Sequence, residues 1–266
     1  MARAGTTTRE GGITALLGAV GILSVLAVWE LSSSLGLFDK SSFPPPSDVL
    51  PNLVDQFGSH AFWTAAWQTF ESTAIGLAIS VAIGLPLGVM IGLSRSAYLS
   101  TRVLIEMLKP IPPVALLPLG LIIYGTTLKM KLLLIVFGTL WPLLIQTTGG
   151  VRDVDTILLD TAQSYQLGRR RTVLSVVLPT AAPYVATGLR LAAVAAFVLS
   201  IVTELVGGAS GLGLSMQNVE NGADYTSLYA LIIAAGLFGL AINQLCALLE
   251  RRLLHWHASQ RSTVLR

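Results

Sequence analysis

The sequence alternates between long apolar segments and short polar stretches from end to end. About six of the apolar segments reach the roughly 20 residues that an α-helix needs to cross the hydrocarbon core of a bilayer. Only 12% of the residues are charged, against about 25% in a typical soluble domain. The sequence therefore predicts an all-α, polytopic membrane helix bundle that forms a single domain over residues 1–266. The expected spans cover residues 13–35, 64–93, 104–124, 132–149, 186–206 and 227–249.

Basic residues are unevenly distributed between the two sides of the predicted bundle. Arg3 and Arg9 precede the first apolar segment as in a signal peptide, but no small-residue cleavage site follows cleanly, so we expect a retained span. If the amino end is cytoplasmic, 14 of the 17 Lys and Arg residues lie on the cytoplasmic side, Arg190 among them. The three on the other side are Lys40, Lys129 and Lys131. This bias predicts cytoplasmic amino and carboxyl ends and a cytoplasmic segment 151–183.

Residues 151–183 form the long polar interruption of the apolar pattern. Apolar residues recur there at spacings of three and four, which predicts one face of a helix. The residues on that face are Val154, Ile157, Leu158, Thr161, Ala162 and Tyr165. Asp153 or Asp155 is expected to cap its start, and Pro179 and Pro183 are expected to stop or kink a helix. Such a helix can dock into a partner protein or rest on lipid headgroups, and the pattern leaves both open.

The same segment carries a spaced motif. It resembles the EAA loop of bacterial ABC-importer permeases, which reads Glu-Ala-Ala, three residues, Gly, nine residues, Ile-x-Leu-Pro. Here Asp160-Thr161-Ala162 takes the first place and Gln166 the glycine place, and Val176, Leu178 and Pro179 complete the end. The departures are Asp for Glu, Thr for Ala and Gln for Gly.

The flexible backbone that the glycine would give is expected from Gly168 instead. The resemblance extends from about Trp29 to about Trp256. The sequence around residues 162–165 and 207–213 is similar to that of the family branch that imports sulfonates, taurine and nitrate. It implies the pore subunit of an ATP-driven importer for a small solute, such as one of these anions, in the bacterial inner membrane.

The resemblance also implies partners. They are a second permease copy, as a homodimer, two cytoplasmic ABC ATPase subunits and an external solute-binding protein, besides membrane lipid. The chain has no phosphate-binding loop, so ATP and Mg would be bound by the ATPase. We expect no enzymatic activity, cofactor, metal site or nucleic-acid partner in this chain. The residues implied in ATPase coupling are Asp160, Thr161, Ala162, Gln166, Leu167, Gly168 and Pro179.

Small residues mark two expected helix-packing stripes. One consists of Gly76, Ser80, Gly84, Gly88 and Gly92, spaced four apart. Such a stripe lets a second helix backbone approach closely. The stripe of residues 188–200 ends in Glu204, for which we expect a gating or structural polar contact, although a carboxylate in water at the outer interface remains an alternative. Met107, Pro112, Pro113 and Glu204 are the expected pathway or gate residues.

The connecting segments give weaker signals. We expect a stiff extended connector at residues 36–60, a basic turn at residues 95–102 and a polar loop at residues 207–225. Glu106 is expected to pair with Lys109. Lys129 and Lys131 are expected to extend to the interface, which leaves no buried cation in the last three spans. The single cysteine, Cys246, allows no intrachain disulfide.

Two other functions compete with import driven by ATP. A secondary transporter or channel would need intramembrane ionisable residues or related halves, and few acidic residues and no clear repeat are present. An intramembrane protease is suggested by Gly208-Ala209-Ser210-Gly211. The serine would need a base, and the histidines, His60, His255 and His257, all lie outside the predicted spans.

Overall fold

The computed structural model describes residues 6–36, 39 and 41–254. Arg3, Lys40, His255 and His257 therefore lie outside the described residues. Every regular element in that range is helical, which confirms the predicted all-α bundle. The elements are α1 (Thr6–Ser34), α2 (Pro46–Gly58), α3 (His60–Leu93), α4 (Arg95–Leu108), a 3₁₀ turn η1 (Pro113–Leu116), α5 (Leu117–Tyr124), α6 (Leu128–Arg152), α7 (Thr156–Ser164), α8 (Arg169–Thr172), a π-helical turn η2 (Val173–Val177), α9 (Leu178–Gly207), α10 (Leu212–Asn221) and α11 (Tyr225–Leu253).

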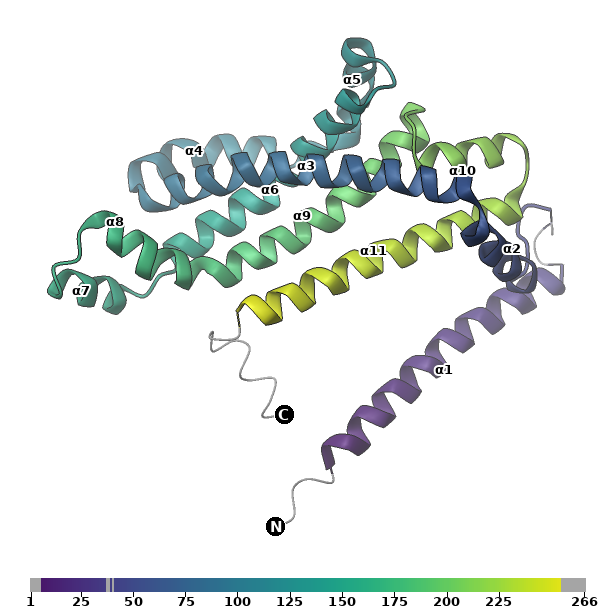
Figure 1. Ribbon diagram of the computed structural model, residues 1–266, viewed down its shortest axis with the longest axis horizontal. Helices are drawn as coiled ribbons and strands as arrows, with labels where there is room; N and C mark the ends of the chain where they lie inside the picture. The colour runs from purple at the N-terminus through teal and green to yellow at the C-terminus, as the bar shows by residue number, and fades with distance from the viewer. Residues whose placement is uncertain (1–5, 37–38, 40, 255–266) are drawn as a thin grey trace.

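Five stretches of the described chain are long and apolar enough to cross a membrane. A sixth is obtained if α4 and the η1–α5 pair count as one span, which is bent by 78°. Pro110, Pro112 and Pro113 lie at this bend, where proline removes a backbone donor and blocks the preceding helical turn. Figure 1 shows α5 pointing away from the layer of α3, α6 and α9.

The basic turn expected at residues 95–102 is wrong, because α4 begins at Arg95. Ser94 caps it by accepting a hydrogen bond from the Ala97 amide at 3.2 Å. Within α4, Glu106 pairs with Arg102 at 2.8 Å rather than with Lys109. Arg102 lies one turn back on the same exposed face, whereas Lys109 follows the last residue of α4 as the chain enters the proline segment.

The bundle is held together where α3 and α9 pack on neighbouring faces of α6 and also contact each other. The small-residue stripe of α3 lies against α6: a Cβ built on Gly76 would be 2.4 Å from Ile135, and one on Gly88 would be 2.7 Å from Thr147. Ser80 and Thr139 share a hydrogen bond of 2.6 Å in the same seam. The two backbones therefore approach more closely than any larger side chain at these positions would allow.

Two connectors contain helices where we expected none. In residues 36–60 the prolines begin α2, since proline favours the first turn of a helix. Val49 and Leu53 of α2 pack with Phe62 and Ala230, which buries an apolar face that periodicity alone did not reveal. The polar loop at residues 207–225 likewise contains α10.

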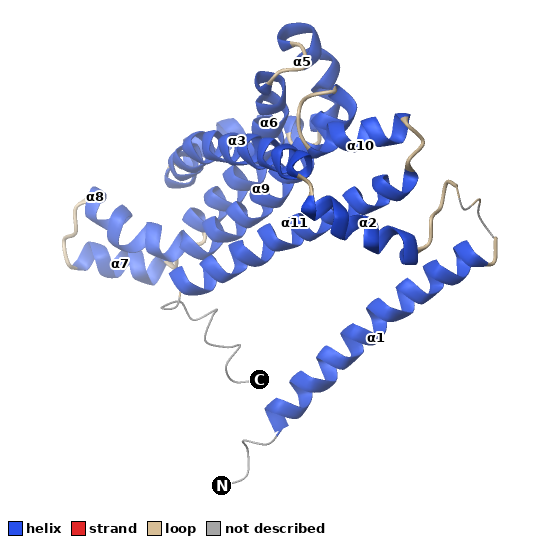
Figure 2. Cartoon of the chain, turned by 45° about the vertical axis from the view of Figure 1, so that its right-hand side comes forward, coloured by secondary structure: helices blue, strands red, loops and turns tan. Residues whose placement is uncertain are grey.

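Helix α1 stands apart from the other helices (Figure 2). Its described side chains are largely exposed, and it is attached near its end. The Trp29 indole donates to the Pro44 carbonyl at 3.1 Å, and the Ser33 hydroxyl donates to the Phe43 carbonyl at 2.8 Å. An apolar helix with so little covered surface is suited to lipid or to another protein.

Candidate functional site

The segment 151–183 forms one end of the bundle, with α7 and α8 at the far left of Figure 1. Asp155, not Asp153, caps α7: its carboxylate accepts from the Ile157 amide at 2.8 Å. Asp153 instead accepts a hydrogen bond from the Tyr184 hydroxyl and so joins the end of α6 to α9. These two aspartates fix where the chain leaves the bundle and where α7 begins.

The expected apolar face of α7 is divided between the bundle and solvent. Val154 and Ala162 are buried. Ile157 and Tyr165 are 69% and 78% exposed, and Leu158 is also exposed. Asp160 and Thr161 are exposed beside them. The segment thus presents large apolar side chains to the outside at the tip of the molecule.

Gln166 occupies the motif's glycine place in a left-handed conformation, with φ of +52°. The Leu167 amide donates to the Ala162 carbonyl at 3.0 Å and the Gln166 amide donates to the Gln163 carbonyl at 2.8 Å. This is the Schellman pattern that ends a helix, in which the left-handed residue is usually glycine. The expectation that Gly168 supplies the flexible turn is wrong, because Gly168 has φ of −62° and precedes α8.

The prolines that follow do not stop the helix. α8, η2 and α9 run without a break from Arg169 to Gly207. Pro179 would clash with the carbonyl four residues back, at Ser175, and that residue lies in the π-helical turn η2. The exposed arginines 169–171 begin this long helix instead of ending the previous one.

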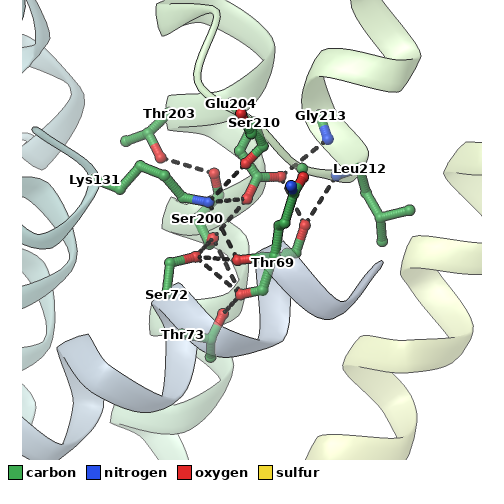
Figure 3. A network of polar contacts seen from close by, with 12 residues as sticks. Thr69, Ser72, Thr73, Lys131, Ser200, Thr203, Glu204, Ser210, Leu212 and Gly213 are labelled. Carbon is green, nitrogen blue, oxygen red and sulfur yellow. Dashed lines mark hydrogen bonds and ion pairs between the residues drawn. The ribbon is translucent and has the colours of Figure 1, made fainter. Parts of the chain in front are cut away.

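A second cluster of polar side chains is enclosed at the opposite end of the bundle, near α10 (Figure 3). Lys131 is only 3% exposed and forms an ion pair with the fully buried Glu204. Its Nζ also donates to the carbonyls of Ser210 at 3.0 Å and Gln68 at 3.4 Å. The expectation that Lys131 extends to the interface is therefore wrong. The expectation that the last three spans hold no buried cation is wrong for the same reason.

Glu204 accepts hydrogen bonds through both oxygens. The donors are the hydroxyls of Thr69 at 2.8 Å and Ser200 at 3.0 Å and the Gly213 amide at 3.0 Å. We call Thr69, Ser72, Lys131, Ser200 and Glu204 the Lys131–Glu204 network. It joins α3, α6, α9 and the start of α10 (Figure 3), so Glu204 is a structural contact and not a carboxylate in water.

Glycine is needed where the chain passes this network. Gly211 has φ of +149°, and a Cβ there would lie 2.1 Å from the Glu204 carboxyl carbon. A Cβ on Gly213 would lie 2.3 Å from the Ile201 carbonyl oxygen. Gly211, the last residue of the suggested protease motif, thus leaves room for the buried carboxylate, and the neighbouring Ser210 contributes its carbonyl to Lys131.

The expected pathway residues do not gather at one place. Met107 is 71% exposed on α4 and Pro112 is exposed at the bend. Pro113 lines a recess together with Gly138 and residues of α9 and α11. Glu204 is enclosed in the Lys131–Glu204 network and does not line that recess.

Comparison with known proteins identifies the family to which the chain belongs. Residues 84–255 match the family described as "Binding-protein-dependent transport system inner membrane component". The chain is 34% identical to the aliphatic sulfonates transport permease protein SsuC of Escherichia coli (strain K12), over 88% of this chain and 89% of that protein. It is 30% identical to the taurine transport system permease protein TauC of the same organism, over 92% and 90%.

Other matches agree with these. The nitrate import permease protein NrtB of Leptolyngbya laminosa is 25% identical, over 88% of this chain and 86% of that protein. Among solved structures, the MetNI methionine ABC transporter in an inward-facing form has a similar fold, with a TM-score of 0.64 at 19% identity over 72% of this chain and 95% of that chain. The chain belongs to the family of binding-protein-dependent transport system inner membrane components.

Proposed function

We propose that this chain is the membrane subunit of an ABC importer for a small oxyanion-bearing solute, and that α7 and the turn after it dock into a separate ATPase. Relatives named for sulfonates, taurine and nitrate support the solute class. The observation that carries the docking is the exposed apolar tip of the 151–183 segment, formed by Ile157, Leu158 and Tyr165.

Docking would bury these side chains in a groove of the ATPase. An amphipathic helix that offers apolar residues at helical spacing fits such a groove. Asp160 and the arginines 169–171 at the rim would set its orientation through charge. Asp155, Gln166 and the turn to Gly168 would hold the tip in shape, so that movement of the ATPase is passed on to α6 and α9.

The proposed energy source is ATP hydrolysis by the separate subunits. ATP and Mg would be bound by two ATPase subunits, and their closure would draw together the docked tips of two permease copies. The long helices α6 and α9, which meet at the segment, would then tip from an inward-open to an outward-open packing. An external solute-binding protein would deliver the solute at the α10 end, and α7 and both termini would then lie in the cytoplasm and the bundle in the bacterial inner membrane.

A copurification experiment tests the proposal. The tagged chain is isolated from native membranes, and the associated ATP hydrolysis is measured. We expect an ATPase subunit to copurify, and Ile157→Asp to remove both it and the stimulated hydrolysis without lowering the melting temperature of the permease, because Ile157 is 69% exposed.

The matched control is Val54→Asp on α2, which is 70% exposed at the opposite end and should leave the ATPase bound. If the chain purifies alone and transports solute with an ion gradient in place of ATP, it is a secondary transporter and the proposal is wrong. Equal ATPase recovery with both variants would instead place the docking surface elsewhere.

A further inference from the structure

Besides Lys131, a second cation lies within the length of the long helices. Arg190 is at the thirteenth position of α9, about 18 Å from its first residue and about 21 Å from Glu204 at 1.5 Å per residue. Its neighbour Gly188 packs against Pro142 and Gln146 of α6, so this part of α9 lies inside the bundle. A charged side chain at such a depth is costly in lipid and usually faces protein or a water-filled cavity.

Arg190 lines a recess of about 610 Å³. Pro113 and Gly138 line it together with apolar residues of α9, Val194 and Val198 among them. Most of the lining is apolar, and the polar side chains are those of Thr187, Arg190 and Asn243. An apolar cavity of this size with a few convergent polar groups is typical of small-molecule sites.

The guanidinium of Arg190 is oriented without being neutralised. Its Nε donates to Asn243 Oδ1 of α11 at 2.8 Å. No carboxylate forms an ion pair with it among residues 6–36, 39 and 41–254. Glu250 is two turns farther along α11 and also contributes no such pair. A neutral amide therefore holds the side chain while its positive charge and its two Nη groups stay available.

We infer that Arg190, held by Asn243, binds the negatively charged oxygen group of the solute as it passes through the recess. A guanidinium edge matches two oxygens of a sulfonate, nitrate or carboxylate in a bidentate hydrogen bond. The apolar walls strengthen this attraction, because they lower the local dielectric constant. Calling the bound group a solute in transit rests on the proposed import function; the anion site itself does not.

Direct binding to the purified protein, with or without an attached ATPase, tests the inference. The probe is radiolabelled ethanesulfonate, and the competitor is ethyl methyl sulfone, a neutral molecule of similar shape. We expect saturable ethanesulfonate binding that the sulfone does not displace. Arg190→Gln should weaken it by roughly tenfold to a hundredfold, as expected for loss of hydrogen bonds to a charged group.

Three further variants keep the test decisive. Arg190→Lys should recover part of the affinity, because it restores charge but not the planar fork. Asn243→Leu should weaken binding, because the guanidinium loses its orienting bond. Arg251→Gln, which removes an exposed arginine outside the recess, should bind as the wild type does. Unchanged melting temperatures would show that the variants are folded.

Two results would overturn the inference. Wild-type affinity in Arg190→Gln, or no ethanesulfonate binding at all, means that the recess is not an oxyanion site. If Arg190→Gln instead loses phosphatidylglycerol binding and keeps ethanesulfonate binding, the arginine serves a lipid headgroup. Failure of import would look different: no ATPase would copurify, whatever happens at Arg190.

Discussion

The two ends of this molecule handle polar and charged groups in opposite ways. At the α10 end the Lys131–Glu204 network is enclosed, and each member has its partners inside the chain. At the α7 end the segment 151–183 exposes Ile157, Leu158 and Tyr165 together with charged side chains. The first end is complete within one chain, and the second is suited to a partner.

This difference indicates that one end of the bundle stabilises the fold and that the other is suited to binding a partner. A buried ion pair with every oxygen and proton satisfied fixes the register of the helices that meet there. The uncovered apolar face of a projecting helix contributes no burial energy to the fold until a partner protein or lipid covers it. Arg190 is intermediate, since it is oriented by Asn243 but its charge is left uncompensated.

Breaking the enclosed end should have the largest effect on stability. Lys131→Met leaves Glu204 buried without its cation, which should lower the free energy of unfolding by about 3–5 kcal/mol. Denaturant titration of the purified permease measures this. The double variant Lys131→Met/Glu204→Leu should recover part of the loss, because no charge then remains buried. If the single variants Lys131→Met and Glu204→Leu both unfold as the wild type does, the network has no structural role.

The seam that joins the two ends should come next. Gly88→Ala places a Cβ 2.7 Å from Thr147, and we expect a loss of about 1–3 kcal/mol from overpacking. Gly236→Ala on α11 is the control, because no atom lies within 4 Å of the added Cβ. That variant should be neutral or gain up to about 1 kcal/mol, as alanine favours a helix over glycine. Thermal unfolding in detergent compares the two, and equal losses would contradict the close seam.

The turn after α7 should give the smallest effect. Gln166→Gly relieves the left-handed conformation, which costs a non-glycine residue roughly 1–2 kcal/mol, and glycine's chain entropy offsets roughly 0.5–1 kcal/mol of that. We expect slower hydrogen exchange at the Leu167 amide with ATPase docking retained. Gly168→Ala should change neither property, since its φ of −62° suits alanine and the space is open. Faster hydrogen exchange at the Leu167 amide in Gln166→Gly would contradict backbone strain at Gln166.

The sequence predicted the bundle well because a bilayer leaves little choice: apolar segments of span length must form helices. It predicted Glu204 as a polar contact because the residue continues a stripe of small residues. It missed the partner Lys131, because periodicity indicates which face of a helix packs against a neighbour but not which helix that neighbour is. The signal that was available is a lysine beside the start of one predicted span and a glutamate near the end of the next.

Other errors have local causes. Helices α2 and α10 are short and lie in polar connectors, where proline and glycine suggested loops although proline also begins helices. A charge count that includes Arg190 on the cytoplasmic side does not reveal its hydrogen bond to Asn243 or the recess that it lines. The spacing of the motif identified Gln166 as the residue in the glycine place. Its left-handed backbone conformation is visible only in the structure.

Photocrosslinking from the α7 tip tests the central claim most directly. A photoreactive phenylalanine analogue is placed at Leu158, and separately at Val54 of α2 as the exposed control at the other end. We expect light to join the Leu158 variant to an ATP-binding subunit in native membranes, and the Val54 variant to form no such adduct. Equal adducts from both positions, or an adduct with lipid alone at Leu158, would contradict ATPase docking at this tip.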